Sequence, residues 1–158
     1  MKVATGTDII EISRIKNAIE KRTEKFLRKI FTENEIKYCE TKNKAKYEAY
    51  AVRFSAKEAI YKAINDDIDS NISWLDVEIT NKENGKPEVI FLNKKYQEIE
   101  CIDISLSHCK EYATATVVII YNKEKRIWIY LIHMHIIMMK NLRQIEMKLL
   151  IKYIKMAY

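Results

Sequence analysis

The chain has 158 residues, of which 48% are apolar, two are glycine and one is proline. This length supports a single domain with a real core and leaves little sequence for linkers or low-complexity segments. The net charge of +6 comes from residues 123–158, which hold eight basic and two acidic side chains, whereas residues 1–122 hold 20 of each. The basic character of the chain is therefore no argument that its main part binds nucleic acid.

The first predicted elements are a strand and a helix. Apolar residues dominate positions 2–12 on both sides of Gly6, and we expect a short strand that ends at Asp8. From Ser13 onward the apolar side chains recur at helical spacing, so Ser13 is predicted as the N-cap of a helix. This helix covers the basic segment 14–29, which holds seven cations and two acids.

Two further helices follow along the chain. Thr32 and Glu35 have the spacing of a capping box, which predicts a short helix through Cys39. A long helix is predicted over residues 46–64. One of its faces carries small side chains at spacings of four, three and four, which permits close packing. These residues are Val52, Ala56, Ala59 and Ala63.

The rest of the main part has the alternation of strands. Strands are predicted over residues 74–80, 88–92, 102–107 and 113–121, with a hairpin-type turn at Asn84-Gly85-Lys86-Pro87 between the first two. Helices followed by a run of strands indicate an α+β domain, in which one long helix packs on a mainly antiparallel sheet.

Residues 123–158 differ in composition from everything before them. The apolar run 127–139 is too short to cross a bilayer, which takes about 20 residues. Apolar side chains then recur at helical spacing among lysines, at Leu142, Ile145, Leu149 and Tyr153. The pattern fits a basic amphipathic helix that packs on the domain, on a partner chain or on a membrane surface, and it also fits sequence without a selected role. We favour a non-catalytic extension, which gives two domains, 1–122 and 123–158.

Cysteine usage and the N-terminus both bear on the compartment. Cys39, Cys101 and Cys109 are an odd number without metal-ligand spacing, which favours reduced thiols. The first residues run directly into folded-looking sequence, so we expect no signal peptide and a cytoplasmic protein.

Acidic side chains offer one candidate metal site. Asp8 and Glu58 together would supply two oxygen ligands, from which Mg²⁺ sites that also use water and substrate phosphates are built. Lys62 lies four residues after Glu58, one turn along the same helix face, and Arg53 and Lys57 repeat that spacing. The alternative interpretation is that Asp8 is a turn residue and Glu58 a solvated helix position, since spacing alone does not bring the two together.

Other candidate residues also have a plain structural interpretation. The turn at 84–87 can present backbone groups and a cation to a nucleotide, or it is a hairpin turn only. His108 ends a strand and is either a ligand contact or a structural histidine. The basic segment 14–29 either docks an acidic protein or is a solvated helix face.

Four separate stretches, in order, resemble the holo-[acyl-carrier-protein] synthase family of 4′-phosphopantetheinyl transferases. They are Gly6-Thr7-Asp8-Ile9-Ile10-Glu11, the segment from Arg53 to Ala63 that reads RFSAKEAIYKA, the turn Asn84 to Pro87, and Ser105-Leu106-Ser107-His108 with Ala113. The resemblance covers residues 1 to about 122. Ser55 stands where the family has alanine, and residues 123–158 match nothing in the family pattern.

The resemblance implies an activity and a role for each site residue. The family moves phosphopantetheine from coenzyme A to a serine of acyl carrier protein and leaves adenosine 3′,5′-bisphosphate. It implies Asp8 and Glu58 as Mg²⁺ ligands on the pyrophosphate, with Lys62 at the reacting phosphate. Arg53 and His108 are then candidates for the 3′-phosphate, and Asn84, Gly85, Lys86 and Pro87 for the adenine.

The resemblance also implies partners. A basic helix face would bind the acidic helix of the carrier protein, through Arg14, Arg22, Lys25, Phe26 and Arg28. Family members form trimers, in which the small-residue stripe of the long helix would serve close packing between subunits. The rival hypothesis is a binding module that has lost catalysis, and a transfer assay distinguishes the two.

Overall fold

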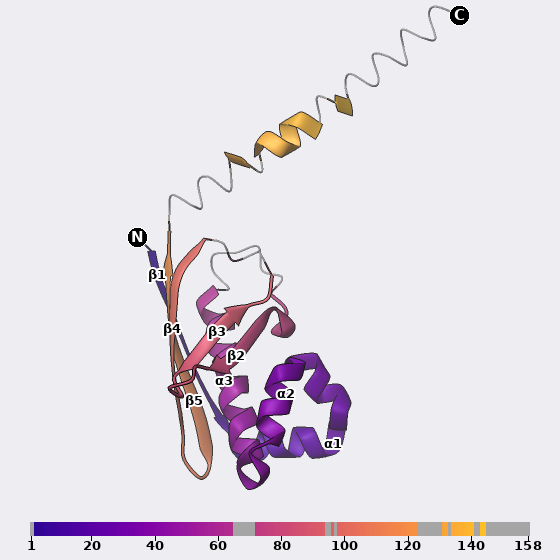
Figure 1. The fold of residues 1–158 in the computed structure, drawn as a ribbon, viewed down its shortest axis with the longest axis vertical. Helices are drawn as coiled ribbons and strands as arrows, with labels where there is room; N and C mark the ends of the chain where they lie inside the picture. The colour runs from indigo at the N-terminus through magenta and orange to yellow at the C-terminus, as the bar shows by residue number, and fades with distance from the viewer. Residues whose placement is uncertain are drawn as a thin grey trace, which may run out of the picture. The chain divides into compact units, whose positions relative to one another are not determined.

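The computed structural model describes residues 2–64, 72–93, 96 and 98–122, and within the C-terminal part residues 131–132, 134–140 and 143–144; the side chains of Arg22 and Thr23 lie outside this description. The chain divides into two compact units, Met1–Tyr121 and Asn122–Tyr158. Figure 1 shows the elements of the first unit, a group of helices beside antiparallel strands.

A three-stranded sheet forms one layer of the first unit. Its order is β1(Lys2–Glu11), β5(Tyr112–Tyr121) and β4(Ile99–His108), and both pairs are antiparallel. The register runs without interruption from Lys2 opposite Tyr121 to Glu11 opposite Tyr112. Alternate residues of β5 are buried, which is the period of a sheet with one covered face.

The long helix α3(Lys46–Ile64) covers the inner face of this sheet (Figure 1). Ala56, Ala59 and Ala63 are buried in one cluster with Val117 and Ile119 of β5. A Cβ at Gly6 of β1 would lie 1.9 Å from the Ala59 carbonyl oxygen, so the two backbones touch there. The small-residue stripe therefore packs within the protomer, which corrects the expectation that it serves packing between subunits.

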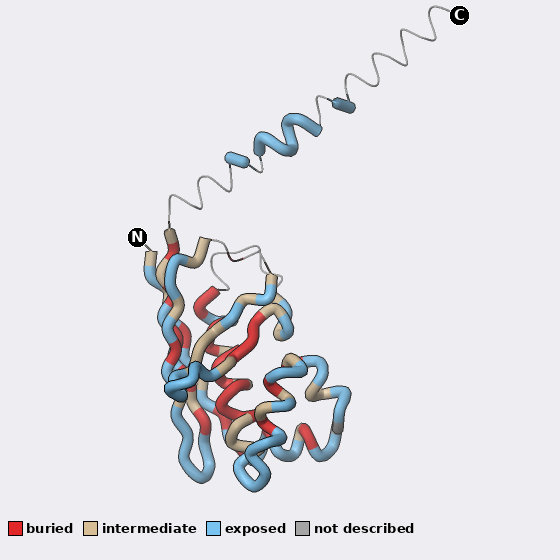
Figure 2. The backbone as a smooth tube through the Cα atoms, viewed as in Figure 1, coloured by how far each residue is buried: buried red, intermediate tan, exposed pale blue. Residues whose placement is uncertain are grey.

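Two further helices pack against α3. Helix α1(Ile12–Ile30) and helix α2(Glu33–Glu40) bury apolar side chains in a second cluster with Tyr50 of α3. Thr32 and Glu35 form the predicted capping box, because each side chain accepts a hydrogen bond from the other residue's backbone N–H. Figure 2 shows buried backbone concentrated along α3 and the faces that pack on it.

A two-stranded antiparallel ribbon completes the unit. It pairs β2(Val77–Asn81) with β3(Pro87–Phe91) and is separate from the first sheet. A single 3-10 turn at Asn43–Ala45 precedes α3, and another at Trp74–Asp76 precedes β2. The α+β prediction of one long helix on antiparallel strands is confirmed.

Three local predictions are wrong. Strand β1 does not end at Asp8, because its ladder with β5 continues to Glu11. Ser13 is not the N-cap, since Ile12 is already helical and its backbone N–H bonds the Glu111 carbonyl oxygen, 2.8 Å away. The strand predicted from residue 74 begins at Val77, because the Ser73 hydroxyl accepts from the Leu75 N–H and starts the 3-10 turn.

The second unit contains helical residues within its described positions, and many of these are apolar and exposed. Exposed apolar side chains in the helical stretch 134–140 are Met134, Ile136, Ile137, Met138 and Met139. Within the described residues, no helix is long and apolar enough to cross a membrane. Leu142, Ile145, Leu149 and Tyr153, predicted at helical spacing, lie outside the described residues.

Candidate active site

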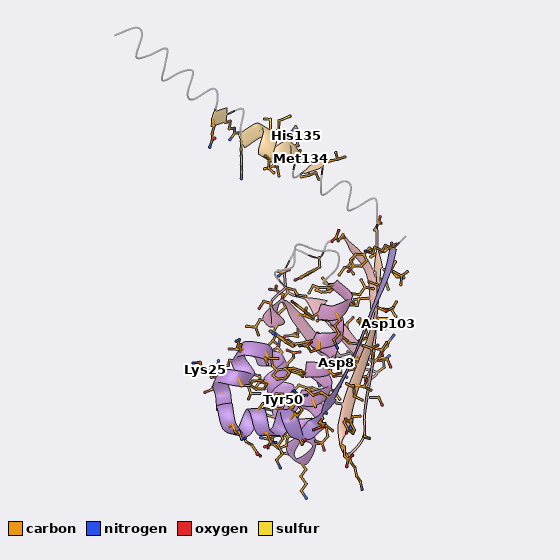
Figure 3. All side chains as sticks on the ribbon, turned by 180° about the vertical axis from the view of Figure 1, so that it is seen from behind. Asp8, Lys25, Tyr50, Asp103, Met134 and His135 are labelled. Atoms are coloured by element: carbon orange, nitrogen blue, oxygen red, sulfur yellow. The ribbon has the colours of Figure 1, made fainter. Side chains whose placement is uncertain are left out.

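Asp8, Glu58 and Lys62 form one charged cluster between β1 and α3. The Lys62 Nζ lies 2.8 Å from the Asp8 Oδ1 and 3.2 Å from the Thr7 carbonyl oxygen. Glu58 lies one turn before Lys62 on the same helix, and the charges of both Asp8 and Lys62 act on its carboxylate. The fold thus brings together residues that are 50 positions apart in the sequence. Figure 3 labels Asp8 on β1 beside this helix.

Two hydroxyl groups hold the backbone at Asp8. The Ser55 Oγ donates to the Asp8 carbonyl oxygen at 2.9 Å, and the Thr114 Oγ1 donates to the same oxygen at 2.8 Å. Ser55 is fully buried on α3, and Thr114 lies directly beside β1 on β5. Asp8 therefore has a fixed backbone position between helix and sheet, and its carboxylate projects from a rigid support.

The two carboxylates are suited to a divalent cation. Burial raises the pKa of Glu58 above its usual range, the Asp8 charge raises it further, and the Lys62 charge opposes both. Partly desolvated carboxylates that repel each other gain from a cation between them. Among the described residues no group of three or more His, Cys, Asp or Glu side chains gathers, so the protein would supply two ligands. That number is common for Mg²⁺, which takes its other ligands from water and phosphates.

A cavity of about 320 Å³ lies between α3, the β2–β3 ribbon and the end of β4. Arg53 reaches it from α3, where its side chain is almost fully buried and stacks 4.0 Å over the Tyr38 ring. The Arg53 Nη2 donates to the Asn81 Oδ1 at 2.8 Å. The Arg53 Nε and the Glu48 Oε2 are buried and have no hydrogen-bond partner in the described part of the chain. The cavity therefore has mainly apolar walls and presents a buried guanidinium, a cation that suits an anionic ligand.

His108 and two of the four residues of the predicted turn border the same cavity. Gly85, Pro87 and His108 line it, whereas Asn84 and Lys86 do not. The Asn84 Oδ1 accepts from the Lys86 backbone N–H at 3.0 Å, and the Lys86 ammonium pairs with Asp103 of β4. Gly85 has φ +84°, a left-handed conformation that glycine adopts without cost.

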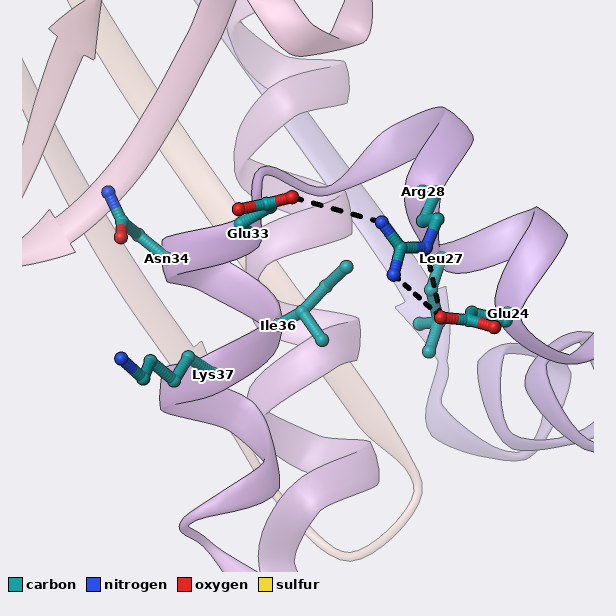
Figure 4. A pocket seen from close by; sticks show the side chains of 7 residues that line it. All are labelled: Glu24, Leu27, Arg28, Glu33, Asn34, Ile36 and Lys37. Atoms are coloured by element: carbon teal, nitrogen blue, oxygen red, sulfur yellow. Dashed lines mark hydrogen bonds and ion pairs between the residues drawn. The ribbon is translucent and has the colours of Figure 1, made fainter.

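The basic face of α1 is only partly free. Arg14 and Lys25 are exposed and Phe26 is half-buried, with Lys25 labelled on α1 in Figure 3. Arg28 lies 2.7 Å from Glu24 and 3.8 Å from Glu33, so its charge is already paired within the chain (Figure 4). These three side chains border a cavity of about 440 Å³ between α1 and α2. The side chain of Arg22 is outside the described part of the structure.

Four polar residues that line the 320 Å³ cavity were not found by sequence reasoning. Tyr38 and Lys42 lie at the end of α2 and just after it, Glu48 lies in the first turns of α3, and Asn81 ends β2. Tyr38 carries a cation on its ring from Lys42 as well as from Arg53. Only Asn81 had a usable signal, since it lies three residues before the turn that begins at Asn84.

Comparison with known proteins gives one consistent result. The family model described as 4′-phosphopantetheinyl transferase superfamily matches residues 4–117. Holo-[acyl-carrier-protein] synthase of Ruminiclostridium cellulolyticum is 45% identical over 124 residues, which are 75% of this chain and 92% of that protein. The synthase of Chlamydia pneumoniae is 45% identical over 115 residues, covering 72% of this chain and 93% of that protein.

Solved structures agree with the sequence relatives. The Helicobacter pylori holo-[acyl-carrier-protein] synthase in complex with coenzyme A is similar at a TM-score of 0.65 and 31% identity, covering 73% of this chain and 99% of that one. The Bacillus anthracis synthase in complex with CoA (3′,5′-ADP) has a TM-score of 0.63 and 38% identity, covering 75% and 96%. The chain therefore belongs to the holo-[acyl-carrier-protein] synthase family of the 4′-phosphopantetheinyl transferase superfamily.

Proposed function

We propose that this protein transfers 4′-phosphopantetheine from coenzyme A to the acceptor serine of apo-acyl carrier protein, with Mg²⁺ as cofactor and adenosine 3′,5′-bisphosphate as the second product. The observation that carries this proposal is the cluster that Asp8 of β1 forms with Glu58 and Lys62 of α3, the helix that also carries Arg53 of the cavity. Glu58 follows Arg53 by five residues on this helix, which is a rise of about 7.5 Å along its axis.

Different residues would bind different parts of coenzyme A. Arg53 and His108 would bind the 3′-phosphate in the cavity, and the turn Asn84 to Pro87 would lie against the adenine. Both relatives with solved structures described above were obtained with coenzyme A or its nucleotide part, which supports a nucleotide in the equivalent cavity. The stacked Arg53–Tyr38 pair supplies a preorganised planar cation for that phosphate.

The reaction itself is a substitution at phosphorus. The serine oxygen forms a bond to the phosphorus that bears the pantetheine, the bond from that phosphorus to the bridging oxygen breaks, and the hydroxyl proton is released. Mg²⁺ held by Asp8 and Glu58 would neutralise charge on the pyrophosphate. Lys62, half-exposed beside Asp8, would contact the leaving phosphate and stabilise its added negative charge.

Two protein partners belong to the proposal. Acyl carrier protein would bind the face of α1 that bears Arg14, Arg22, Lys25, Phe26 and Arg28. A homotrimer would form on the outer face of the three-stranded sheet, where Val3 and Ile9 of β1 and Val118 of β5 are exposed. Apolar side chains on one open sheet face are typical of an interface.

We assign the activity to residues 1–122 and propose that residues 123–158 are a non-catalytic extension in a cytoplasmic protein, with no nucleic-acid partner. The family model ends at residue 117 and the first compact unit at Tyr121, which supports this division.

The test is a transfer assay with coenzyme A, Mg²⁺ and apo-acyl carrier protein, read as the mass of the carrier. Wild type is expected to convert the carrier to the phosphopantetheinylated mass. Glu58→Gln is expected to reduce turnover by about a hundredfold or more while carrier binding stays nearly unchanged, because a metal ligand is lost. The control is Glu100→Gln, an exposed carboxylate of β4 outside the site. No mass gain with wild type would refute the activity, and normal turnover of Glu58→Gln would refute its metal role.

A further inference from the structure

Two buried charges take no part in the proposed chemistry. Lys57 of α3 is 4% exposed and Glu35 of α2 is 1% exposed, and the Lys57 Nζ lies 2.7 Å from the Glu35 Oε2. A buried ion pair is a poor source of stability, because desolvation offsets its attraction. The other contacts of these two side chains therefore indicate what the pair does.

Both side chains bind the free edge of β2. The Leu92 N–H donates to the Asp76 carbonyl oxygen across the ribbon, so the backbone groups of the alternate residues Val77 and Ile79 face away from β3. The Lys57 Nζ donates to the Val77 carbonyl oxygen at 2.7 Å, and the Ile79 N–H donates to the Glu35 Oε1 at 3.0 Å. The ion pair thus takes the place of a neighbouring strand.

The same pair joins the helices around this edge. The Glu35 Oε2 accepts from the Thr32 N–H at 2.8 Å, which completes the capping box of α2. The Lys57 Nζ also donates to the Ile30 carbonyl oxygen at the end of α1 and to the Trp74 carbonyl oxygen before β2. One ammonium and one carboxylate therefore fix α1, α2, α3 and β2 to one another.

This edge leads directly to the nucleotide cavity. Asn81 lies two residues beyond Ile79 on β2, and its side chain accepts from Arg53, one helical turn before Lys57. The Asn81 Nδ2 in turn donates to the Gly85 carbonyl oxygen at 3.1 Å. Arg53, Asn81 and Gly85 all line the cavity, so a shift of β2 along α3 would change its shape.

We propose that Glu35 and Lys57 are a positioning pair for coenzyme A: they hold β2 in register against α3 and so set the cavity in which the nucleotide binds. This inference rests on the proposed function, because it takes coenzyme A as the ligand of that cavity. Neither residue touches the ligand.

The test compares Glu35→Gln and Lys57→Met with wild type by calorimetric titration of coenzyme A and of adenosine 3′,5′-bisphosphate, together with steady-state kinetics. In both variants we expect the Kd and the KM for coenzyme A to rise about tenfold or more. The reason is that one buried charge is left without its partner and the edge of β2 loses the side chain that binds it. The kcat at saturating coenzyme A is expected to stay within about threefold, because Asp8 and Lys62 are untouched.

A purely structural role would give a different result. Tyr50→Phe is the matched control, since Tyr50 is fully buried on α3 and donates to Glu40 at 3.0 Å without contacting β2. It is expected to lower the melting temperature and leave the Kd for coenzyme A unchanged. The positioning role is overturned if the Glu35 and Lys57 variants lose melting temperature in the same way while their Kd for coenzyme A stays unchanged.

The remaining outcomes are also decisive. If wild type does not bind coenzyme A, the proposed function and this inference are both overturned. If wild type binds and the folded variants bind equally well, only the inference is overturned.

Asn34→Ala replaces the two variants if both fail to fold, because the Asn34 Nδ2 donates to Glu78 of β2 at 3.2 Å from an exposed position. We expect the Kd of this variant for coenzyme A to rise about twofold or more, and an unchanged Kd overturns the inference.

Discussion

At the scale of single residues, Lys62 links the two halves of the proposed chemistry. Its ammonium lies 2.8 Å from Asp8, and its charge also acts on Glu58. In the proposed function, Lys62 would therefore compete with a divalent cation for the same carboxylates, and it would become free to contact phosphate when that cation binds. The order in which metal and coenzyme A bind would depend on this competition.

Lys62→Met is expected to tighten Mg²⁺ binding while it reduces transfer. Removing an exposed ion pair is worth up to about 1 kcal/mol, so we expect the Kd for Mg²⁺ to fall roughly two- to fivefold in calorimetric titration without coenzyme A. Lys82→Met is the control, since Lys82 is as exposed as Lys62 and its ion pair with Glu88 lies away from Asp8. Weaker Mg²⁺ binding by Lys62→Met would contradict the competition.

The buried thiol of Cys39 makes the free energy of unfolding depend on pH in the alkaline range. Burial raises the pKa of its thiol from an ordinary value of 9.0 to about 12, so the folded state keeps the proton that the unfolded state releases. Its contribution is complete below pH 9 and is lost as pH rises toward 12. We expect this residue alone to cost about 1 kcal/mol of unfolding free energy by pH 10, measured by urea titration.

Cys39→Ala isolates this effect from other groups. The burial of Tyr96 also raises its phenol pKa to about 12, so the stability of the variant still falls at high pH, with a smaller slope. Equal slopes between pH 8 and 10 for wild type and Cys39→Ala would show that the thiol does not contribute.

At the scale of elements, the contact of β1 with α3 determines where Asp8 lies. A Cβ at Gly6 would meet the Ala59 carbonyl oxygen at 1.9 Å and the Ala63 backbone nitrogen at 3.1 Å. Neither backbone atom can move without shifting the helix. Any side chain at position 6 therefore separates the strand that carries Asp8 from the helix that carries Glu58.

Gly6→Ala is expected to destabilise the protein by about 3 kcal/mol or more, as overpacking against backbone does, and to abolish Mg²⁺ binding in any folded fraction. Gly85→Ala is the matched control. A Cβ at position 85 would have no atom within 4 Å, so the only cost of this substitution is the φ of +84°, about 1 kcal/mol. Urea unfolding of both variants measures the difference, and equal losses would contradict the close approach.

At the scale of the whole molecule, the three-stranded sheet has one covered and one open face. Helix α3 covers the inner face, whereas Val118 of β5 is 40% exposed on the outer one. In the proposed trimer this open face would be buried between subunits, which accounts for apolar residues there.

Val118→Asp is therefore expected to yield a monomer in analytical ultracentrifugation, because a charge in an apolar interface is left unpaired. Ile90→Asp is the control, because Ile90 is exposed to a similar extent, 38%, but lies on β3 of the separate ribbon. A trimeric Val118→Asp, or a wild-type protein that is monomeric at micromolar concentration, would refute this interface.

Local patterns were sufficient for much of the fold. The capping box at Thr32 and Glu35 and the bounds of the 46–64 helix follow from neighbours in sequence, and the structure confirms both. The predicted strand end at Asp8 and the predicted N-cap at Ser13 were wrong because distant residues decide where these two elements meet. The ladder with β5 extends β1 past Asp8, and the Glu111 carbonyl oxygen binds the Ile12 N–H.

The sequence by itself determined the α+β class, the family and the residue types of the site, because four ordered motifs and helical spacing are local properties of the chain. Only the tertiary structure decided that Lys62 pairs with Asp8, that Ser55 supports the Asp8 backbone, and that Lys57 faces the edge of β2. Arg53 and Lys57 have the same spacing as Glu58 and Lys62, so the sequence could not separate their tasks. The physical reason is that the partners of these charges lie on strands remote in sequence, and burial, rather than spacing, assigns each cation its carboxylate or carbonyl group.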